Sequence, residues 1–312
     1  MGAAIACALS AQTINWVAAG SPSARCCMGM VYNPTTQATV LFGGANNDKQ
    51  DLNDTWTYQG MWREMSPANS PSPRNGMGMA SDNAGNIVLF GGGTVSTCCL
   101  NDTWTWDGTN WTEQSPPVSP SPRAATMRFD PATGLVVLFG GWDGSGPLGD
   151  TWTWDGKART WTQRTPATSP APRSGPAMAY YAASQTFLLF GGGGTGNTCF
   201  VDTWSWNGTT WTQLFPAASP APPRTGESME YDPTIKQVVL FGGAANNTWE
   251  DSLDDTWLWS GSTWTKATPA TVPPNRYSFG LVYQPSLKAL VMFGGYSTGP
   301  ARGDTWLLDL EP

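Results

Sequence analysis

The stretch VLFGGWDGSGPLGDTWTWDGKARTWTQ, Val137 to Gln163, decides the fold. An apolar run ends in two glycines, a short polar loop follows, and an Asp-Thr-Trp segment then alternates tryptophan with threonine. Alternation with a period of two is typical of a β-strand, and Asp-Gly pairs are typical of tight turns. The stretch therefore predicts short strands that are joined by a polar loop and a turn.

The same pattern occurs six times in the 312 residues. The first glycines of the pairs are Gly43, Gly91, Gly140, Gly191, Gly242 and Gly294, which gives a period of about 50 residues. Each pair is followed by an Asp-Thr-Trp, which begins at Asp54, Asp102, Asp150, Asp202, Asp255 and Asp304. Each pair is preceded by an arginine, at Arg25, Arg74, Arg123, Arg173, Arg224 and Arg276.

Each unit is expected to form four short strands, which in the second unit begin at Arg74, Asn86, Asp102 and Asn110. A small sheet that is apolar on both faces must pack against copies of itself, and radial packing produces a propeller. The prediction is an all-β fold, a six-bladed β-propeller of four-stranded antiparallel blades.

The last unit ends at DTWLLDLEP, 304–312, and has no fourth strand. The N-terminal segment INWVAAGSPSAR, 14–25, matches TNWTEQSPPVSPSPR, 109–123, in its Asn-Trp, its Ser-Pro loop and its arginine. We therefore expect the N-terminal strand, which carries Trp16, to complete the sixth blade and close the ring. Closure removes the open sheet edges. The propeller is expected to be a single domain over residues 12–312.

Residues 1–11, MGAAIACALSA, are too short to span a bilayer. They are interpreted as the remnant of a secretory signal peptide, cut ahead of Gln12, or as the lead-in to a strand. The first interpretation predicts a secreted, periplasmic or cell-surface protein with no membrane span.

Charge and composition exclude several functions. The formal net charge is -7, and no basic stripe is present to neutralise phosphates, so nucleic acid is not expected as a partner. The chain has no histidine, which removes the usual general base and the commonest zinc and copper ligand. The acidic loops 46–54 and 246–255 lack the fixed ligand spacing of a calcium site. No cofactor, metal site or catalytic residue is predicted.

From about Gln12 to Pro312 the chain resembles the kelch repeat family. The resemblance rests on the apolar run ending in Gly-Gly, the variable loop, the Asp-Thr-Trp and the lone tryptophan of the fourth strand. Many kelch repeats carry a histidine soon after the arginine, where this chain has Met, Gly, Ala, Pro or Glu. The resemblance implies a propeller, and some kelch adaptors of ubiquitin ligases use arginines at this position to bind acidic peptides.

The six arginines are expected to surround one mouth of the central channel, where they can attract an anion. Alternatively, each guanidinium satisfies loop carbonyls or an aspartate of its own or a neighbouring blade. The two roles are compatible.

The tryptophans that recur in every unit are expected in the core, whereas Trp142 and Trp249 lie in variable loops and are candidates for ligand stacking. Three charged residues break the repeat. Arg128 and Glu230 stand where other units have small apolar side chains, and Glu227 stands where others have Met, Ala, Pro or Phe. Each either binds a ligand or lines a solvated channel.

Six cysteines are present. Cys26, Cys27, Cys98 and Cys99 fall near one rim in neighbouring blades, and we expect them to oxidise, across the blades or within each adjacent pair. The alternative is that all four are reduced, apolar side chains. Cys199 is expected to be the odd thiol.

Three functions compete. The favoured one is a binding module whose rim loops take a glycan, a peptide or a protein. The second, implied by the resemblance, is a metal-free sugar mutarotase or epimerase like the sialic acid mutarotases, with acid–base work by Arg128, Glu227 and Glu230. The third is a structural, self-assembling surface protein, so the oligomeric state stays open.

Overall fold

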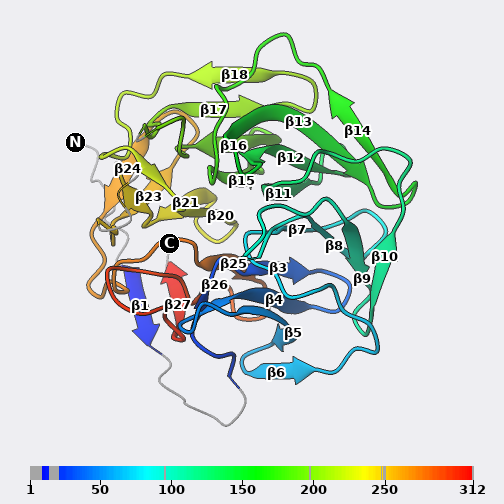
Figure 1. Cartoon of the computed structure of the whole chain (residues 1–312). Coiled ribbons are helices and arrows are strands. Elements are labelled where there is room, and N and C mark those ends of the chain that lie inside the picture. The colour runs from blue at the N-terminus through cyan, green and yellow to red at the C-terminus, as the bar shows by residue number, and fades with distance from the viewer. Residues whose placement is uncertain are drawn as a thin grey trace, which may run out of the picture.

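The computed structural model describes residues 9–13, 21–94, 96–196, 198–246, 248 and 251–310. Six antiparallel blades, each built on four strands, surround a central channel, which confirms the predicted six-bladed propeller (Figure 1). Across these ranges the chain forms no helix that is long and apolar enough to cross a membrane.

The strands are given blade by blade, from the channel outward. Blade one has β3 (Gly29–Asn33), β4 (Ala38–Asn46), β5 (Asp51–Tyr58) and β6 (Trp62–Met65), and blade two has β7 (Gly78–Ser81), β8 (Ile87–Phe90), β9 (Thr103–Trp106) and β10 (Trp111–Gln114). Blade three has β11 (Ala124–Asp130), β12 (Leu135–Trp142), β13 (Pro147–Asp155) and β14 (Thr160–Arg164), and blade four has β15 (Ala177–Tyr181), β16 (Thr186–Phe190), β17 (Thr203–Trp206) and β18 (Trp211–Leu214).

Blade five has β20 (Ser228–Asp232), β21 (Gln237–Phe241), β23 (Thr256–Trp259) and β24 (Trp264–Ala267), and blade six has β25 (Gly280–Gln284), β26 (Ala289–Phe293), β27 (Thr305–Leu310) and β1 (Leu9–Thr13). Three short strands lie at the rim: β2 (Arg25–Cys26) pairs with β4, and β19 (Arg224–Thr225) pairs with β22 (Ala244–Ala245). The innermost strands β3, β7, β11, β15, β20 and β25 contact one another in that order, and β25 contacts β3.

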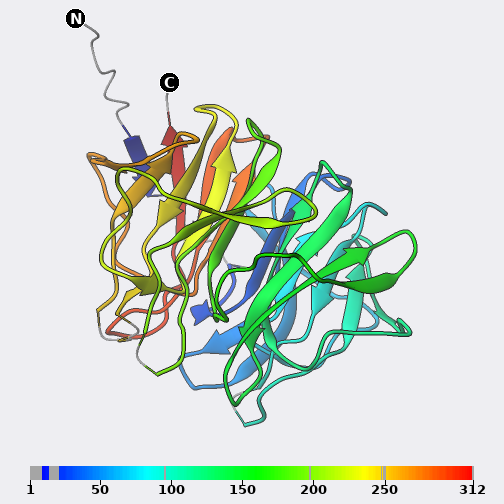
Figure 2. The same ribbon diagram turned by 90° about the horizontal axis from the view of Figure 1, so that it is seen from above.

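The N-terminal strand closes the ring, as predicted. Figures 1 and 2 show β1 beside β27, and the two pair antiparallel with Ala11 opposite Leu308 and Thr13 opposite Trp306. In the other blades the tryptophan of the fourth strand lies opposite the second aromatic residue of the third, as Trp111 lies opposite Trp106. The closing strand thus lies upstream of the segment expected from the repeat, and Trp16 is outside the described residues.

The glycine pairs join each blade to the next. The N–H of the second glycine donates to the carbonyl of the arginine in the following blade at 2.9–3.0 Å in all six places, from Gly44 to Arg74 through to Gly295 and Arg25. The first glycine has a φ of about 62–69° and lies against that same carbonyl, so it has no room for a Cβ. The glycine pair that marks each repeat therefore links its blade to the next one in the ring.

Tryptophans form a second link between the blades. The indole N–H of the fourth-strand tryptophan donates to a threonine of the preceding blade, for example Trp111 Nε1 to Thr55 Oγ1 at 2.9 Å. The same bond recurs at 2.9–3.1 Å from Trp62, Trp161, Trp211 and Trp264. The six tryptophans of the Asp-Thr-Trp segments, which were predicted to lie in the core, are buried (Trp56, Trp152, Trp306) or half-buried (Trp104, Trp204, Trp257). The described fourth-strand tryptophans are buried too, except for the half-buried Trp62.

Candidate ligand-binding site

The six arginines of the repeat are buried and paired. In every blade the two Nη atoms contact both oxygens of the Asp-Thr-Trp aspartate, at 2.5–2.8 Å and 2.7–3.0 Å, and Nη1 also donates to the carbonyl of the first glycine. The same aspartate accepts the indole N–H of the tryptophan two residues on. Anion binding by these arginines stays a prediction, and their burial and pairing argue against it.

The aspartates keep their charge. Burial raises the pKa of each carboxyl, but the hydrogen bonds and positive charge of the arginine outweigh burial and hold the pKa below its usual value. The six pairs are therefore fixed parts of the rim.

A circle of backbone hydrogen bonds, here called the collar, surrounds the channel just below this rim. Its members have positive φ and are Cys27, Gly76, Gly175, Gly226 and Ser278. Four of these N–H groups donate to the collar residue of the preceding blade: Gly76 to Cys27, Cys27 to Ser278, Ser278 to Gly226 and Gly226 to Gly175. The collar is thus built from main chain and does not depend on the side chains.

Blade three interrupts the collar. One residue fewer lies between Arg123 and Asp130 than between Arg74 and Asp82, so blade three has no residue that corresponds to Gly76. Ala125 N–H still donates to Gly76, but no described backbone hydrogen bond joins Gly175 N–H to blade three. The ring of hydrogen bonds is therefore open between blades three and four.

A pocket of about 520 Å³, the mouth pocket, lies at this opening. Its walls come from the rim loops of blades three and four, and from the collar with its flanking residues in blades four to six. They include Trp142, Ser145, Gly146, Ser174, Gly175, Gly194, Thr195, Thr225 and Ser278. No charged residue is among the described residues that line it.

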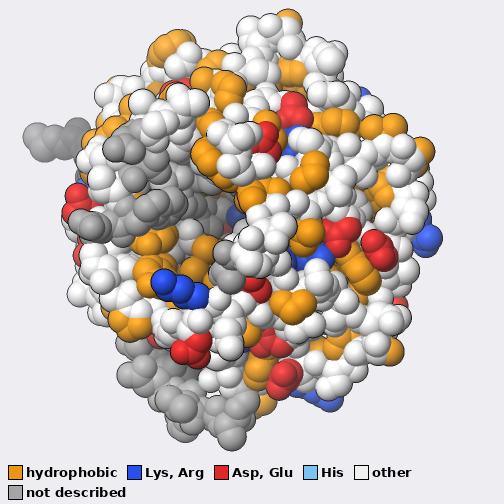
Figure 3. Space-filling model, viewed as in Figure 1, with side chains coloured by type: hydrophobic (Ala, Val, Ile, Leu, Met, Phe, Trp, Pro, Cys, Tyr) orange, Lys and Arg blue, Asp and Glu red, His pale blue; other side chains and the backbone are white. Residues whose placement is uncertain are grey.

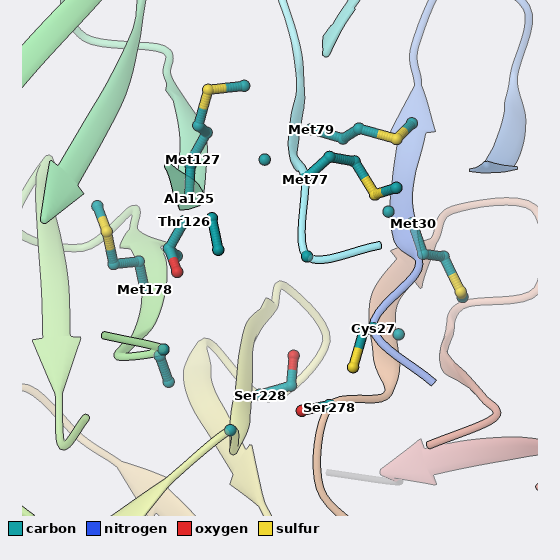
Figure 4. Close-up of a pocket in the computed structure, with 18 of the residues that line it drawn as sticks. Cys27, Met30, Met77, Met79, Ala125, Thr126, Met127, Met178, Ser228 and Ser278 are labelled. Atoms are coloured by element: carbon teal, nitrogen blue, oxygen red, sulfur yellow. The ribbon is translucent and has the colours of Figure 1, made fainter. Parts of the chain in front are cut away.

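The mouth pocket adjoins the channel. Trp142, Ser174, Gly175, Gly226 and Ser278 also line a channel pocket of about 270 Å³ inside the collar. Figure 4 shows side chains from several blades around this second pocket, with Cys27, Ser228 and Ser278 close together and methionines on the other walls.

Trp142 is the aromatic wall that the two pockets share, and its side chain is 38% exposed. It ends β12, directly after the positive-φ pair Gly140-Gly141, and lies opposite Ala124 in the ladder. The Sγ atom of Cys99 lies 3.3 Å from the carbonyl oxygen of Trp142. Ligand stacking by Trp142 stays a prediction, and Trp249 is outside the described residues.

Glu227 points into a seam between blades. It is 6% exposed, and its carboxylate lies against Gly191 of blade four, where Met77 lies against Gly43 in the equivalent seam. Neither carboxylate oxygen has a hydrogen bond among the described residues. Burial raises the pKa of Glu227 to about 8, against smaller opposing effects of nearby amides and of Arg224 and Arg173.

Arg128 and Glu230 lie further along the channel. Arg128 lines the channel pocket and a separate cavity at the far end of the inner strands, and Glu230 lines only the far cavity. Glu227 lines the channel pocket together with Arg128, whereas Glu230 does not, so neither space is lined by all three residues proposed for mutarotation.

The cysteine sulfurs approach within each adjacent pair. Cys98 Sγ and Cys99 Sγ are at bonding distance, and Cys26 Sγ and Cys27 Sγ are 3.2 Å apart. Oxidation of these four residues in the protein remains a prediction.

Charged side chains are sparse on the surface. On the face seen in Figure 3 the Lys, Arg, Asp and Glu side chains are scattered among uncharged ones. Within the described ranges, no three His, Cys, Asp or Glu side chains come together as a metal-binding group.

Sequence reasoning identified Trp142 but missed the small residues of the mouth pocket, such as Ser174 and Gly175. The signal was present, since the residue missing after Arg123 can be counted in the sequence. Its effect on the collar depends on hydrogen bonds between blades, which the spacing alone does not show.

Comparison with protein families gives one match. The model described as the KLHDC2/KLHL20/DRC7 Kelch-repeats domain matches residues 9–166, 59–243 and 135–312, which together run from residue 9 to the end of the chain. No curated protein matches the chain.

Proposed function

The chain belongs to the kelch-repeat family, and from that premise we propose that it is a protein-interaction module whose mouth pocket takes an uncharged peptide segment of a partner. Kelch propellers are generally interaction modules. The proposal adds where the contact is made and what chemistry it uses.

The exposed ring of Trp142 is the observation that carries the proposal. The tryptophans of the third and fourth strands pack between blades. Trp142 has no equivalent in the other repeats and lies at the edge of the mouth pocket. Tryptophan is enriched among the residues that dominate binding energy at protein interfaces, because it buries a large area at little entropic cost.

The other walls fit a peptide backbone. Gly146, Gly175 and Gly194 present main chain without a covering side chain, and Ser145, Ser174 and Thr195 add hydroxyls that both donate and accept. A charged ligand group would find no partner among the described lining residues. We therefore expect the bound segment to be neutral.

An array of peptides and glycans, probed with the purified protein, tests the proposal. Peptides without charged side chains should be retained, and Trp142→Ala should weaken the best of them by about tenfold or more. Phe215→Ala is the matched control, because Phe215 is an aromatic side chain that is 85% exposed and lines none of these pockets.

Salt supplies a second criterion. Binding at an uncharged pocket should change little with added salt, whereas an acidic ligand held by the arginines would be released. Retention of glycans alone, or binding that is unaffected by Trp142→Ala, would contradict the proposal.

A further inference from the structure

The far ends of the six inner strands enclose a cavity of about 300 Å³, here called the far cavity. The mouth pocket lies at the opposite ends of these strands, so the two are separate. Five blades contribute an aromatic ring from the same strand position to its wall: Tyr32, Phe129, Tyr180, Tyr231 and Tyr283. Ser81 holds this position in blade two, and prolines of the following turns complete the rim.

Two opposite charges lie in this aromatic wall. Arg128 on β11 and Glu230 on β20 occupy equivalent strand positions, and blade four, which lies between their blades, has Ala179 there. They are the charged members of the described lining. A small side chain between them leaves space over blade four.

These charges do not neutralise each other by contact. Among the described residues, Arg128 and Glu230 form no ion pair within 4.0 Å. Arg128 Nη1 donates to the carbonyl of Met127 at 3.0 Å, while its buried Nε has no partner. Glu230 accepts the N–H of Tyr231 at 3.2 Å. Both groups therefore keep unused hydrogen-bonding capacity directed at the cavity region.

Arg128 and Glu230 are both half-buried, and a charge that is withdrawn from water is costly unless it is paired. A ligand with a single charge would pair with one of these groups and leave the other. A ligand with an anionic and a cationic group would pair with both, and aromatic faces add a favourable interaction with an ammonium group.

We propose that the far cavity binds a small zwitterion of the amino-acid or betaine class. Its carboxylate contacts Arg128, and its ammonium lies at Glu230 among the tyrosine rings. This site goes beyond the proposed interaction function and does not depend on it.

Calorimetric titration of the full chain with glycine betaine and with L-phenylalanine tests the proposal, at a pH above the Glu230 pKa of about 7 so that this carboxyl is charged. Choline and acetate each carry one of the two charges. At least one zwitterion should bind, about tenfold or more tighter than either single-charge probe.

Variants assign the two contacts. Arg128→Met and Glu230→Gln should each weaken the zwitterion by about tenfold or more. Arg63→Met and Glu64→Gln, on the exposed outer strand β6, are the matched controls and should bind normally. Trp142→Ala should also bind normally, which separates this site from the mouth pocket.

Titration of the unaltered chain with the two zwitterions, choline and acetate tests the proposal even if a variant fails to fold. Binding of neither zwitterion at millimolar concentration would overturn the proposal. Binding of choline or acetate as tight as that of the zwitterions would overturn it as well.

Discussion

The aspartate of each Asp-Thr-Trp contacts two side chains of its own blade, an arginine and a tryptophan. Asp102 holds Arg74, which is almost wholly buried, and also accepts the indole N–H of Trp104. Removing the charge from one partner of a buried pair leaves the other uncompensated.

Asp102→Asn should therefore lower the free energy of unfolding by about 3–5 kcal/mol, the usual cost of breaking a buried ion pair. Urea denaturation measures this loss. Asp107→Asn is the control, because Asp107 lies in an exposed turn of the same blade. Equal losses in the two variants would contradict a special role for the buried pair.

Acid should weaken all six pairs together. The pKa of each of these aspartates is depressed in the folded protein from the ordinary value of 3.8. Their contribution to stability is thus present above 3.8 and is lost as the pH falls through the lower, folded values. Unfolding free energies measured at decreasing pH should fall in this range, and a constant value would contradict the pairing.

The pKa of Glu227 is shifted in the opposite direction, upward. Its folded pKa of about 8 lies above its ordinary value of 4.5, so the folded state binds the proton more tightly. Stability from this group is complete below 4.5 and is lost as the pH rises towards 8. Glu227→Gln should remove this loss and raise the thermal midpoint at pH above 8, relative to the unaltered chain, but not at pH 4. A midpoint that falls at both pH values would contradict it.

For single residues, the sequence showed which ones are unusual but not where their side chains point. Trp142, Arg128, Glu227 and Glu230 all stand out against the repeat. That Glu227 enters a seam while Glu230 faces a cavity depends on the packing of neighbouring blades, and Gly191, which admits the carboxylate, looks the same as every other first glycine.

Among the elements, the fourth strands hold the blades together from outside. Trp111 is fully buried, packs against Phe42 of blade one with ring centroids 5.0 Å apart, and donates to Thr55 of the same blade. The strand therefore pairs its backbone with its own blade, while its tryptophan packs against the preceding blade.

Trp111→Phe should cost the hydrogen bond, about 0.5–1.5 kcal/mol, and some packing, whereas Trp111→Ala should cost about 3–5 kcal/mol. Unfolding in urea gives both values. Thr112→Ala, at an exposed position of the same strand, should have little effect. If both tryptophan variants lose a similar small amount of unfolding free energy, the indole of Trp111 does not hold the two blades together.

The number and order of strands could be predicted from the periodicity, but their first residues could not. The first strand of blade two begins at Gly78 rather than Arg74, because Gly76 has a φ of 64° and belongs to the collar. The aromatic residues that line the far cavity also follow from the alternation, although only the closed ring brings them together.

For the whole molecule, closure of the ring is what creates the channel and the cavities at its two ends. Without β1 the last blade would have three strands and an open edge. A signal cut ahead of Gln12 would remove Leu9, Ser10 and Ala11 from β1. The predicted strand around Trp16 would then have to close the ring. Thr256 would be available to accept the Trp16 indole N–H, because it is the equivalent threonine to which no described indole donates.

Thermal unfolding of chains with different N-termini tests ring closure most directly. A chain that begins at Ser21 lacks both β1 and Trp16, and we predict a much lower midpoint and loss of ligand binding at both ends of the channel. A chain that begins at Gln12 keeps Trp16 and shows whether that segment can close the ring. If the chain that begins at Ser21 unfolds at the same temperature as the full chain, with the same sharpness, the N-terminal strand does not hold the propeller together.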